Sequence, residues 1–300
     1  MSAAWLAVDW GSTNVRLWAL DRDGEVMARR ALSRGSDRLT PADYEPVLLT
    51  LAGKLLPEAG RVPAVLCGMA GARQGWREAP YRAVPCNPAG GETVSVPTRD
   101  PRLDVRIVPG LCRSEPPDVM RGEETQIAGL LALEPVVAGS ACLPGTHAKW
   151  ARVSGGQVVG IATALIGELF ALLSSRSVLR HSLGEGWDEA AFAEGVSRSL
   201  GAPEALVAAL FEPRARSLID GLSGDAARAF LSGLLIGAEL TAMRRFWEEG
   251  QVTIIGQTAL AGRYETALAA QGVAARRVEV EAVTLAGLRA HHARLWGDGT

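Results

Sequence analysis

Two short stretches of this chain carry residue types suited to binding phosphate and accepting a proton. In the first, the apolar run at residues 4–9 ends in Asp9, and Gly11, Ser12 and Thr13 follow before a second apolar run. This pattern predicts a β-hairpin with a carboxylate at its tip. Gly11 would let the backbone approach an anion, the two hydroxyls can donate to phosphate oxygens, and Asp9 can hold a metal ion or its water shell. The alternative is an ordinary hairpin in which Asp9 only shapes a polar turn.

The second stretch begins a predicted helix over residues 123–133. A carboxylate in the first turn of this helix could accept the proton of an attacking alcohol, as phosphoryl transfer requires. Acidic residues also stabilise helix N-termini by about 0.3–1 kcal/mol without any catalytic role. The spacing does not choose between Glu123 and Glu124.

The predicted elements form two similar halves. The first half has strand patterns at 4–9, 15–20 and 25–31, then a helical pattern, further strands and the helix already named, with Pro- and Gly-rich irregular structure at 76–103. The second half repeats the opening meander and then turns helical. The remaining predicted strands are 64–67, 106–111, 136–143, 148–153, 157–164 and 252–255, and the remaining predicted helices are 42–59, 166–180, 188–199, 203–211 and 224–247.

Length and composition set broad limits. The 300 residues suggest two domains, which we place at 1–134 and 135–300, with the C-terminal helix free to pack back on the first. Lys and Arg total 31 against 33 for Asp and Glu, so no global field favours nucleic acid or an anionic membrane. The four cysteines lack metal-site spacing and are expected to be reduced. Without a signal peptide or a long apolar run, we expect a cytoplasmic protein.

Several other residues could contact ligands. In the second half, Gly145 and Thr146 occupy a turn like the first and could bind the γ-phosphate. Lys149, two residues into a strand, could point at substrate or phosphate, and His147 could contact phosphate or substrate or only cap the turn. Arginines could hold an acidic substrate bidentately, although surface arginines are frequent in this chain. The candidates for substrate contact are Arg16, Arg73 with its neighbours Gln74 and Trp76, Arg113, and Glu168 at the start of a helix.

The two hairpins, one opening each half, resemble the paired phosphate-binding hairpins of the sugar kinase, Hsp70 and actin superfamily. Residues 9–13 look like its first phosphate motif and residues 144–150 like its second, while residues 254–260 with Gly256 and Gln257 resemble its adenosine motif. The resemblance implies two duplicated ribonuclease H-like α/β lobes, each a mixed five-stranded sheet with flanking helices, and a cleft between them. Gly233 on a predicted helix could admit a nucleotide or another helix.

Within that superfamily, five blocks resemble the 2-dehydro-3-deoxygalactonokinase family: residues 8–16, 68–71, 121–126, 143–150 and 167–170. The resemblance implies phosphorylation of 2-dehydro-3-deoxy-D-galactonate by ATP and Mg²⁺ to the 6-phosphate, in galactonate catabolism. It favours Glu124 over Glu123 as the base. The expected partners are the sugar acid and ATP, with no nucleic acid or membrane, and a homodimer is allowed for. An exopolyphosphatase-like phosphohydrolase and a non-catalytic regulator of the same superfamily are the rival functions.

Overall fold

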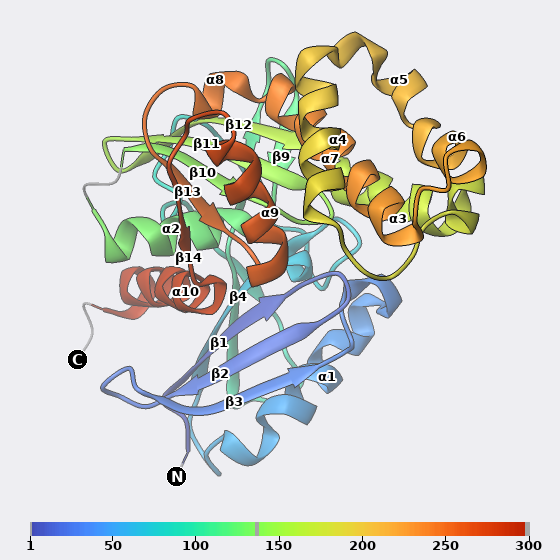
Figure 1. Ribbon diagram of the computed structural model, residues 1–300. Coiled ribbons are helices and arrows are strands. Elements are labelled where there is room, and N and C mark those ends of the chain that lie inside the picture. The colour runs from blue at the N-terminus through green and yellow to red at the C-terminus, as the bar shows by residue number, and fades with distance from the viewer. Residues whose placement is uncertain (1, 136–137, 298–300) are drawn as a thin grey trace. The chain divides into compact units, whose positions relative to one another are not determined.

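The computed structural model describes residues 2–135 and 138–297, and its two larger β-sheets share one strand order (Figure 1). The first sheet runs β3-β2-β1-β4-β7-β6 and the second runs β12-β11-β10-β13-β14. In both, the first hairpin meander lies beside strands that enter later in the sequence, so the predicted duplication of an α/β unit is confirmed. The first sheet has six strands where five were expected, because β6 adds antiparallel to β7 from the Pro- and Gly-rich segment.

The chain divides into two compact units. Unit 1 comprises Met1–Ala138, Val153–Ile161 and Glu279–Thr300, and unit 2 comprises Gly139–Arg152 and Ala162–Val278. The elements of unit 1 are β1 (Trp5–Trp10), β2 (Val15–Leu20), β3 (Val26–Leu32), α1 (Tyr44–Ala52), β4 (Val62–Gly68), β5 (Tyr81–Ala83), β6 (Val94–Val96), β7 (Leu103–Ile107), β8 (Gly110–Arg113), β9 (Asp118–Met120), α2 (Glu123–Leu133) and α10 (Val280–Trp296). The second sheet and the remaining helices are β10 (Gly139–Leu143), β11 (Ala148–Ser154), β12 (Gln157–Ala164), α3 (Ile166–Arg176), α4 (Glu189–Gly201), α5 (Leu206–Ala209), α6 (Glu212–Ile219), α7 (Gly224–Ala242), α8 (Arg244–Trp247), β13 (Val252–Ile255), α9 (Thr258–Ala269) and β14 (Ala275–Val278).

The first sheet buries both faces, because successive side chains of a strand point to opposite sides. On one face Leu6 and Val8 pack with Leu48 of α1. On the other face Ala7 and Cys67 pack with Leu288 of α10. Strands β1, β4 and β7 run parallel, so their carboxyl ends meet at one edge of the sheet. Side chains at those ends are therefore brought close together.

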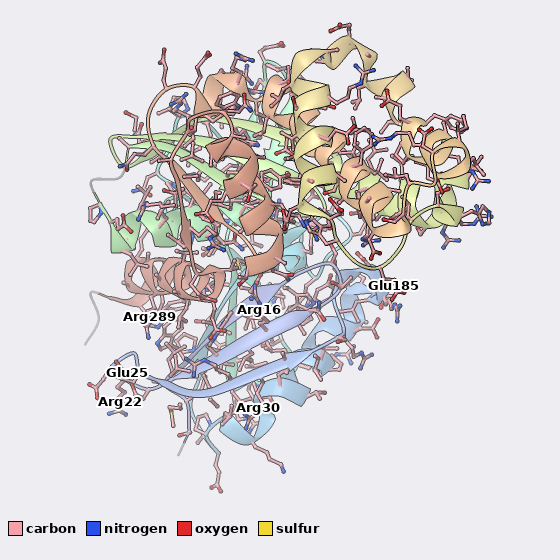
Figure 2. The ribbon with its side chains drawn as sticks, in the orientation of Figure 1. Arg16, Arg22, Glu25, Arg30, Glu185 and Arg289 are labelled. Carbon is pink, nitrogen blue, oxygen red and sulfur yellow. The ribbon has the colours of Figure 1, made fainter. Side chains whose placement is uncertain are left out.

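Helices α2 and α10 pack with almost no side-chain material between them. A Cβ placed on Gly129 would overlap the carbonyl oxygen of Val283, and one placed on Gly287 would overlap the carbonyl oxygen of Thr125. Arg289 of α10 also donates to the Gly24 carbonyl in the turn after β2, at 2.6 Å, the region where Figure 2 labels Arg289 and Glu25. Helix α10 thus packs directly against the first turn of α2.

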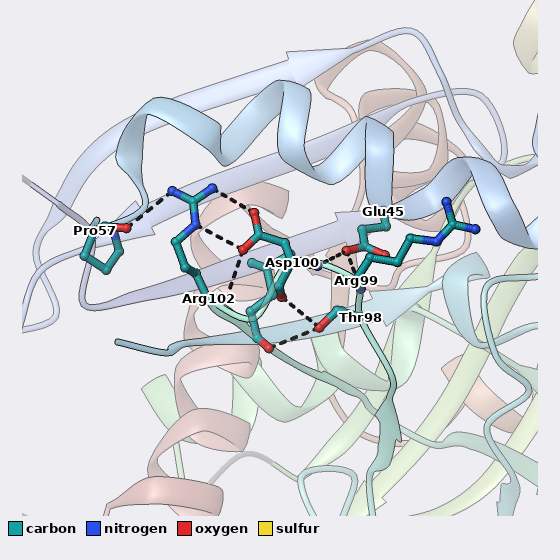
Figure 3. A network of polar contacts seen from close by, with 7 residues as sticks. Glu45, Pro57, Thr98, Arg99, Asp100 and Arg102 are labelled. Carbon is teal, nitrogen blue, oxygen red and sulfur yellow. Dashed lines mark hydrogen bonds and ion pairs between the residues drawn. The ribbon is translucent and has the colours of Figure 1, made fainter. Parts of the chain in front are cut away.

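A polar network ties α1 to the loop before β7 (Figure 3). The Glu45 carboxylate accepts hydrogen bonds from the backbone N–H groups of Arg99 and Asp100, at 2.8 and 2.7 Å. Asp100 in turn pairs with Arg102 at 2.7 Å. These contacts form one wall of a cavity of about 560 Å³ that Trp76 also lines.

In unit 2, strands β10, β11 and β13 pack against α4, α7 and α9 around Trp150, Phe192 and Phe230. Helices α4 and α7 approach closely, because a Cβ on Gly195 would overlap the carbonyl oxygen of Phe230. Within the described part of the chain, no helix is both long and apolar enough to cross a membrane. The four cysteines are free, as expected, and all except Cys112 are buried.

The structure breaks several predicted elements. The strand expected over 106–111 is two strands, since Val108 and Pro109 separate β7 from β8, and the helix expected over 224–247 ends at Ala242 before α8 begins. The helix expected over 42–59 is shortened to α1. The strand expected over 136–143 is β10, while residues 136–137 lie outside the described residues.

Candidate active site

Asp9 lies one residue before the end of β1, in register between Arg16 on β2 and Cys67 on β4. Arg16 donates to Asp9 Oδ2 from Nη2 at 2.5 Å and from Nε at 3.2 Å, and the Cys67 thiol donates to Oδ1 at 3.6 Å. Figure 2 labels Arg16 on β2. The Asp9 side chain is 15% exposed, so one carboxylate is presented at the sheet edge while held from two strands.

The turn that follows is exposed at Ser12, Thr13 and Asn14. Its backbone is braced by the loop after β3, because the N–H groups of Gly35, Ser36 and Asp37 donate to carbonyls of residues 11–13. Among the described residues, no backbone N–H of the turn donates to the Asp9 carboxylate. The turn therefore has a fixed shape that leaves its hydroxyls and Asp9 available to a ligand.

Glu124 is fully buried in the first turn of α2. Its Oε2 accepts from the Gly122 N–H at 2.6 Å, and its Oε1 accepts from the Thr125 hydroxyl at 3.0 Å. Burial, and after it the nearby Glu123 charge, raise the pKa of Glu124 to about 7, against the opposing effect of the hydrogen bonds that its carboxylate accepts. A carboxyl with a pKa near neutrality can take up and release a proton at working pH.

Glycines make room for the first turn of α2 beside β4. Gly68 has φ +80° and Gly122 has φ +105°, which L side chains rarely adopt, and a Cβ on Gly68 would lie 3.5 Å from Asp9 Oδ1. Burial raises the pKa of the Cys67 thiol well above its usual range, and the charges of Asp9 and Glu124 add to the effect. Asp9, Cys67 and Glu124 therefore form one electrostatic cluster within unit 1.

Glu123 is half-buried, and its Oε2 accepts from the Arg121 N–H at 3.1 Å. Arg121 donates to the Ala79 carbonyl at 2.6 Å and lies over the Tyr81 ring, 4.3 Å from its centroid. The segment before α2 is thereby tied to the loop that follows Gly71. Sequence reasoning did not select Arg121, although it stands in one of the quoted blocks.

In unit 2, the turn after β10 lies against the start of α3. A Cβ on Gly167 would overlap the Gly145 carbonyl oxygen, and the Glu168 N–H donates to the Thr146 carbonyl at 2.8 Å. His147 Nε2 and Glu168 Oε2 are 2.6 Å apart. Gly145 has open space around it, as a phosphate-binding turn needs. The structure thus brings Gly145, Thr146, His147 and Glu168 together.

Lys149 is buried in β11, and its Nζ donates to the Thr163 hydroxyl of β12 at 2.9 Å. This hydrogen bond holds the amino group within its own hairpin.

A cavity of about 470 Å³ in unit 2 opens beside this turn. Its walls combine apolar side chains with a few polar groups, a composition typical of small-molecule sites. They are Pro144, Gly145, Thr146, Ile166, Gly167, Phe170, Ser232, Leu235, Ile236, Gln257, Ala259, Leu260, Arg263 and Tyr264. Gln257 precedes the first turn of α9, so the positive end of that helix dipole faces the same region. The cavity joins the second turn to the predicted adenosine motif.

Gly256 and Gln257 differ in their relation to this cavity. Gln257 lines the cavity. Gly256 instead packs against Pro144, whose Cδ would lie 3.3 Å from a Cβ placed on Gly256. Gly233, a candidate for nucleotide approach, instead meets the α4 backbone, because a Cβ there would overlap the Phe192 carbonyl oxygen. Helix packing accounts for Gly233, and its neighbour Ser232 lines the cavity.

Glu239 lies beneath this cavity and joins three elements. Its carboxylate accepts from Trp150 Nε1 of β11 at 2.7 Å and from the hydroxyl of Tyr264 of α9 at 2.6 Å. Burial raises the pKa of Glu239 to about 7, against the effect of the two hydrogen bonds. The neutral acid is therefore the form that the folded state favours.

We predict that Glu239→Gln raises the free energy of unfolding, relative to wild type, more at alkaline pH than at acidic pH. The native pKa of Glu239 lies above its ordinary value of 4.5, so its contribution to stability is present below pH 4.5 and is lost as pH rises through 7. Gln stays neutral, so the variant gains about 3 kcal/mol in unfolding free energy relative to wild type between pH 4.5 and 8. Denaturant unfolding at both pH values measures this. Exposed Glu248→Gln is the control, and identical pH dependences of wild type and Glu239→Gln would contradict the prediction.

The candidate substrate residues other than His147 and Glu168 lie at separate places in unit 1. Arg73 and Gln74 are exposed after the short 3-10 turn Met69–Gly71, and Trp76 is half-buried against Tyr44, with ring centroids 6.0 Å apart. Arg113 on β8 donates to the Pro116 carbonyl at 3.0 Å. Arg16 is paired with Asp9. Of these arginines, Arg73 is the one that the structure leaves exposed next to the Gly68 turn.

Asp9 suits a Mg²⁺ ion that arrives with its nucleotide. Mg²⁺ is typically held by one or two carboxylates together with substrate phosphates. Within the described residues, no group of three or more His, Cys, Asp or Glu side chains could hold a metal ion.

A model of the 2-keto-3-deoxy-galactonokinase family matches residues 9–291, which runs from Asp9 through the first turn of α2 to α10. The chain belongs to this family. The match includes both turns and both carboxylates described above. The family's span therefore also includes α10, which packs behind the first turn of α2.

Named relatives agree with the family. The chain is 38% identical over 300 residues to the Rhizobium meliloti (strain 1021) protein named "Probable 2-dehydro-3-deoxygalactonokinase DgoK1", with 97% of each chain covered. It is 36% identical over 295 residues to the 2-dehydro-3-deoxygalactonokinase of Escherichia coli (strain K12), covering 96% and 97% of the two chains. A crystal structure bearing the same enzyme name, from Sinorhizobium meliloti, matches with a TM-score of 0.88 and 35% identity, covering 97% and 99%.

Sequence reasoning missed several site residues. Cys67 and Thr125 carry polar groups that only the register of β1 with β4 and the start of α2 bring to Asp9 and Glu124. Arg263 and Tyr264 lie on α9, a helix that was not predicted. Their spacing after Gln257, with Leu260 between, follows a helical repeat and could have indicated them.

Proposed function

We propose that this chain transfers the γ-phosphate of ATP to 2-dehydro-3-deoxy-D-galactonate and forms its 6-phosphate. Membership of the family over residues 9–291 carries the proposal. The carboxylates Asp9 and Glu124 in unit 1 and the cavity of unit 2 provide the groups that such a transfer needs. The sugar acid is the one in the names of the family and its relatives, and O6 is the position that the resemblance of the motifs implies.

In this proposal, Glu124 is the general base. Its pKa of about 7 leaves a large fraction ionised at neutral pH, ready to accept the proton of the substrate hydroxyl. The N–H of Gly122 and the hydroxyl of Thr125 hold its two oxygens in place. Glu123 is the alternative base, and it is half-buried and bound to the Arg121 N–H.

Each unit carries one turn whose groups would bind phosphate oxygens. Gly11, Ser12 and Thr13 offer amides and hydroxyls in unit 1, and Gly145 and Thr146 offer the same groups in unit 2. The nucleoside would occupy the cavity lined by Phe170, Ser232 and Gln257. Mg²⁺, held by Asp9 and the phosphates, would neutralise the charge that develops on the transferred group.

The substrate carboxylate needs a fixed cation. We assign this role to Arg73, with Gln74 nearby, because Arg73 is exposed beside the Gly68 turn next to Asp9. Glu168 and His147 are a hydrogen-bonded pair at the second turn and could orient substrate hydroxyls.

A coupled assay of ADP formation tests the proposal. Substrates would be 2-dehydro-3-deoxy-D-galactonate, its gluconate epimer and a mixture lacking any acceptor. ADP should form fastest with the galactonate and should require Mg²⁺, and the product should carry its phosphate on O6 by ³¹P–¹H NMR. Release of phosphate from ATP or polyphosphate at equal rates without an acceptor would overturn it in favour of a phosphohydrolase.

A further inference from the structure

Arg263 of α9 presents a flat guanidinium to the cavity of unit 2. Its central carbon, Cζ, lies 3.5 Å from the centroid of the Trp187 ring, so the two planar groups are in direct contact. Arg263 forms part of the cavity wall, whereas Trp187 does not. Trp187 therefore covers the face of the guanidinium that is turned away from the cavity, and the other face is available to a ligand.

Trp187 is held from two sides. Its ring contacts the ring of Phe192, with centroids 5.3 Å apart, and packs on the hydrophobic core of unit 2. The loop before it is tied to the start of α7, because the Gly186 N–H donates to Asp225 Oδ1 at 2.8 Å and a Cβ on Gly184 would overlap the same carboxylate. Arg263 thus lies on a support that is already in place before a ligand binds.

The charge of Arg263 has no acid in contact with it. In the described part of unit 2, its guanidinium forms no hydrogen bond or salt bridge. Burial lowers the pKa of Arg263, the nearby Arg228 charge lowers it further, and the Glu189 charge acts in the opposite direction. Arg228 itself lies over the ring of Phe170, which also lines the cavity. A half-buried cation beside a second cation favours an electron-rich ring on its open face.

The position of Arg263 along the cavity suits the base of a nucleotide. Gly256 contacts Pro144, so the start of α9 lies beside the turn that contains Gly145. Arg263 follows Gln257 by six residues, which corresponds to about 9 Å along a helix axis. With its phosphates at the turn, a nucleotide in this cavity would have its base directed toward Arg263.

We propose that Arg263 is the stacking platform for the nucleotide base, that Trp187 positions it, and that this pair favours purine over pyrimidine nucleotides. Bases stack on arginine planes as they do on aromatic rings, and the double ring of a purine covers more of such a plane than a single ring does. The inference rests on the proposed function, because it assumes that the cavity receives the nucleotide.

Kinetics with ATP and CTP test the inference. Arg263→Ala should raise the KM for ATP about tenfold, within the range for loss of one stacking contact, and should leave kcat and the KM for the sugar acid unchanged. The KM for CTP should rise less, so the preference for ATP over CTP should shrink. Arg263→Lys should behave like Arg263→Ala, because it keeps the charge and loses the plane. Trp187→Leu should reduce the same preference, because it removes the support of the guanidinium.

Arg244→Ala is the matched control. Arg244 of α8 also lies over a tryptophan ring, that of Trp247, at 5.6 Å, but it is exposed and takes no part in the cavity wall. Its removal deletes the same kind of contact elsewhere in unit 2, so both KM values should stay as in the wild type. A preference for ATP over CTP that is the same in Arg263→Ala and Arg244→Ala would overturn the inference.

Calorimetric binding of ADP, without the sugar acid, gives a readout that does not depend on turnover. Arg263→Ala should bind ADP about tenfold more weakly than the wild type. Equal dissociation constants would contradict the inference, as would a wild type that binds no ADP. If Arg263→Ala does not fold, Arg263→Gln gives the same comparison with a longer side chain. A wild type that binds ADP through Arg263 yet forms no ADP with the sugar acid would mark a failure of the proposed function alone.

Discussion

Replacement of Glu124 by Gln is expected to lower kcat by about 10²–10⁴-fold, the range typical for loss of a general base. Gln keeps the size of the side chain; its amide oxygen can accept from the Gly122 N–H and its amide nitrogen can donate to the Thr125 hydroxyl oxygen, in place of the contacts that hold Glu124 at 2.6 and 3.0 Å. The fold should therefore survive, and KM for ATP should change little because the nucleotide cavity lies in unit 2. Steady-state ADP formation measures the effect.

The pH dependence provides a second measurement of the same assignment. The base must be ionised, so kcat/KM of the wild type should rise with pH through about 7, the pKa of Glu124. Glu123→Gln is the matched control, because it removes the neighbouring negative charge that raises this pKa. It should retain activity and move the acid limb to lower pH. Wild-type turnover by Glu124→Gln together with loss in Glu123→Gln would reverse the assignment of the base.

Asp9→Asn is the second substitution with a large expected effect. It should lower kcat by about 10²-fold or more, as the removal of electrostatic stabilisation of a transition state does. Asn keeps the shape and turn-forming ability of Asp and removes only its charge. Arg16, which pairs with Asp9 at 2.5 Å, would then be left without its carboxylate. Rates measured across a Mg²⁺ titration should show the loss at every concentration.

Asp21→Asn is the matched control for this substitution. Asp21 lies at the turn after β2, where its carboxylate accepts from the N–H groups of Asp23 and Glu25 at 3.0 and 2.8 Å. Asn can make the same turn, so activity should be unchanged. If Asp9→Asn also stayed within threefold of wild type, Asp9 would only shape its hairpin and the proposed metal role would be wrong.

Local chemistry explains which elements the sequence could predict. Helix α2 begins and ends where expected, because Gly122 precedes two acids in its first turn and Pro135 follows its end. The opening hairpin was equally clear from its alternating apolar residues. Helix α6 was not predicted as a separate helix, since Pro213 interrupts the pattern, although Pro is tolerated in a first turn. Strand β14 has the sequence Ala-Arg-Arg-Val and carries almost no apolar signal.

The candidate site also has residues that the sequence predicts and residues that it does not. Asp9, Glu124 and the turn residues stand in short segments whose chemistry is visible in sequence. The walls of the cavity proposed for the nucleotide come from α3, α7 and α9, which are far apart in the chain and meet only through tertiary packing. From the sequence, Cys67 is an ordinary buried thiol, because only the pairing of β1 with β4 places it beside Asp9.

The contact of α10 with α2 has a consequence for the making of this protein. Gly287 of α10 lies against the carbonyl of Thr125 in α2, next to Glu124. All of unit 2, within residues 139–278, is synthesised after α2 and before α10. Domains generally fold as they leave the ribosome, with the N-terminal part first. Here the N-terminal unit cannot complete its packing until the residues of α10 have been translated. In a nascent chain, therefore, the helix that carries Glu124 reaches its final packing only after α10 has been made.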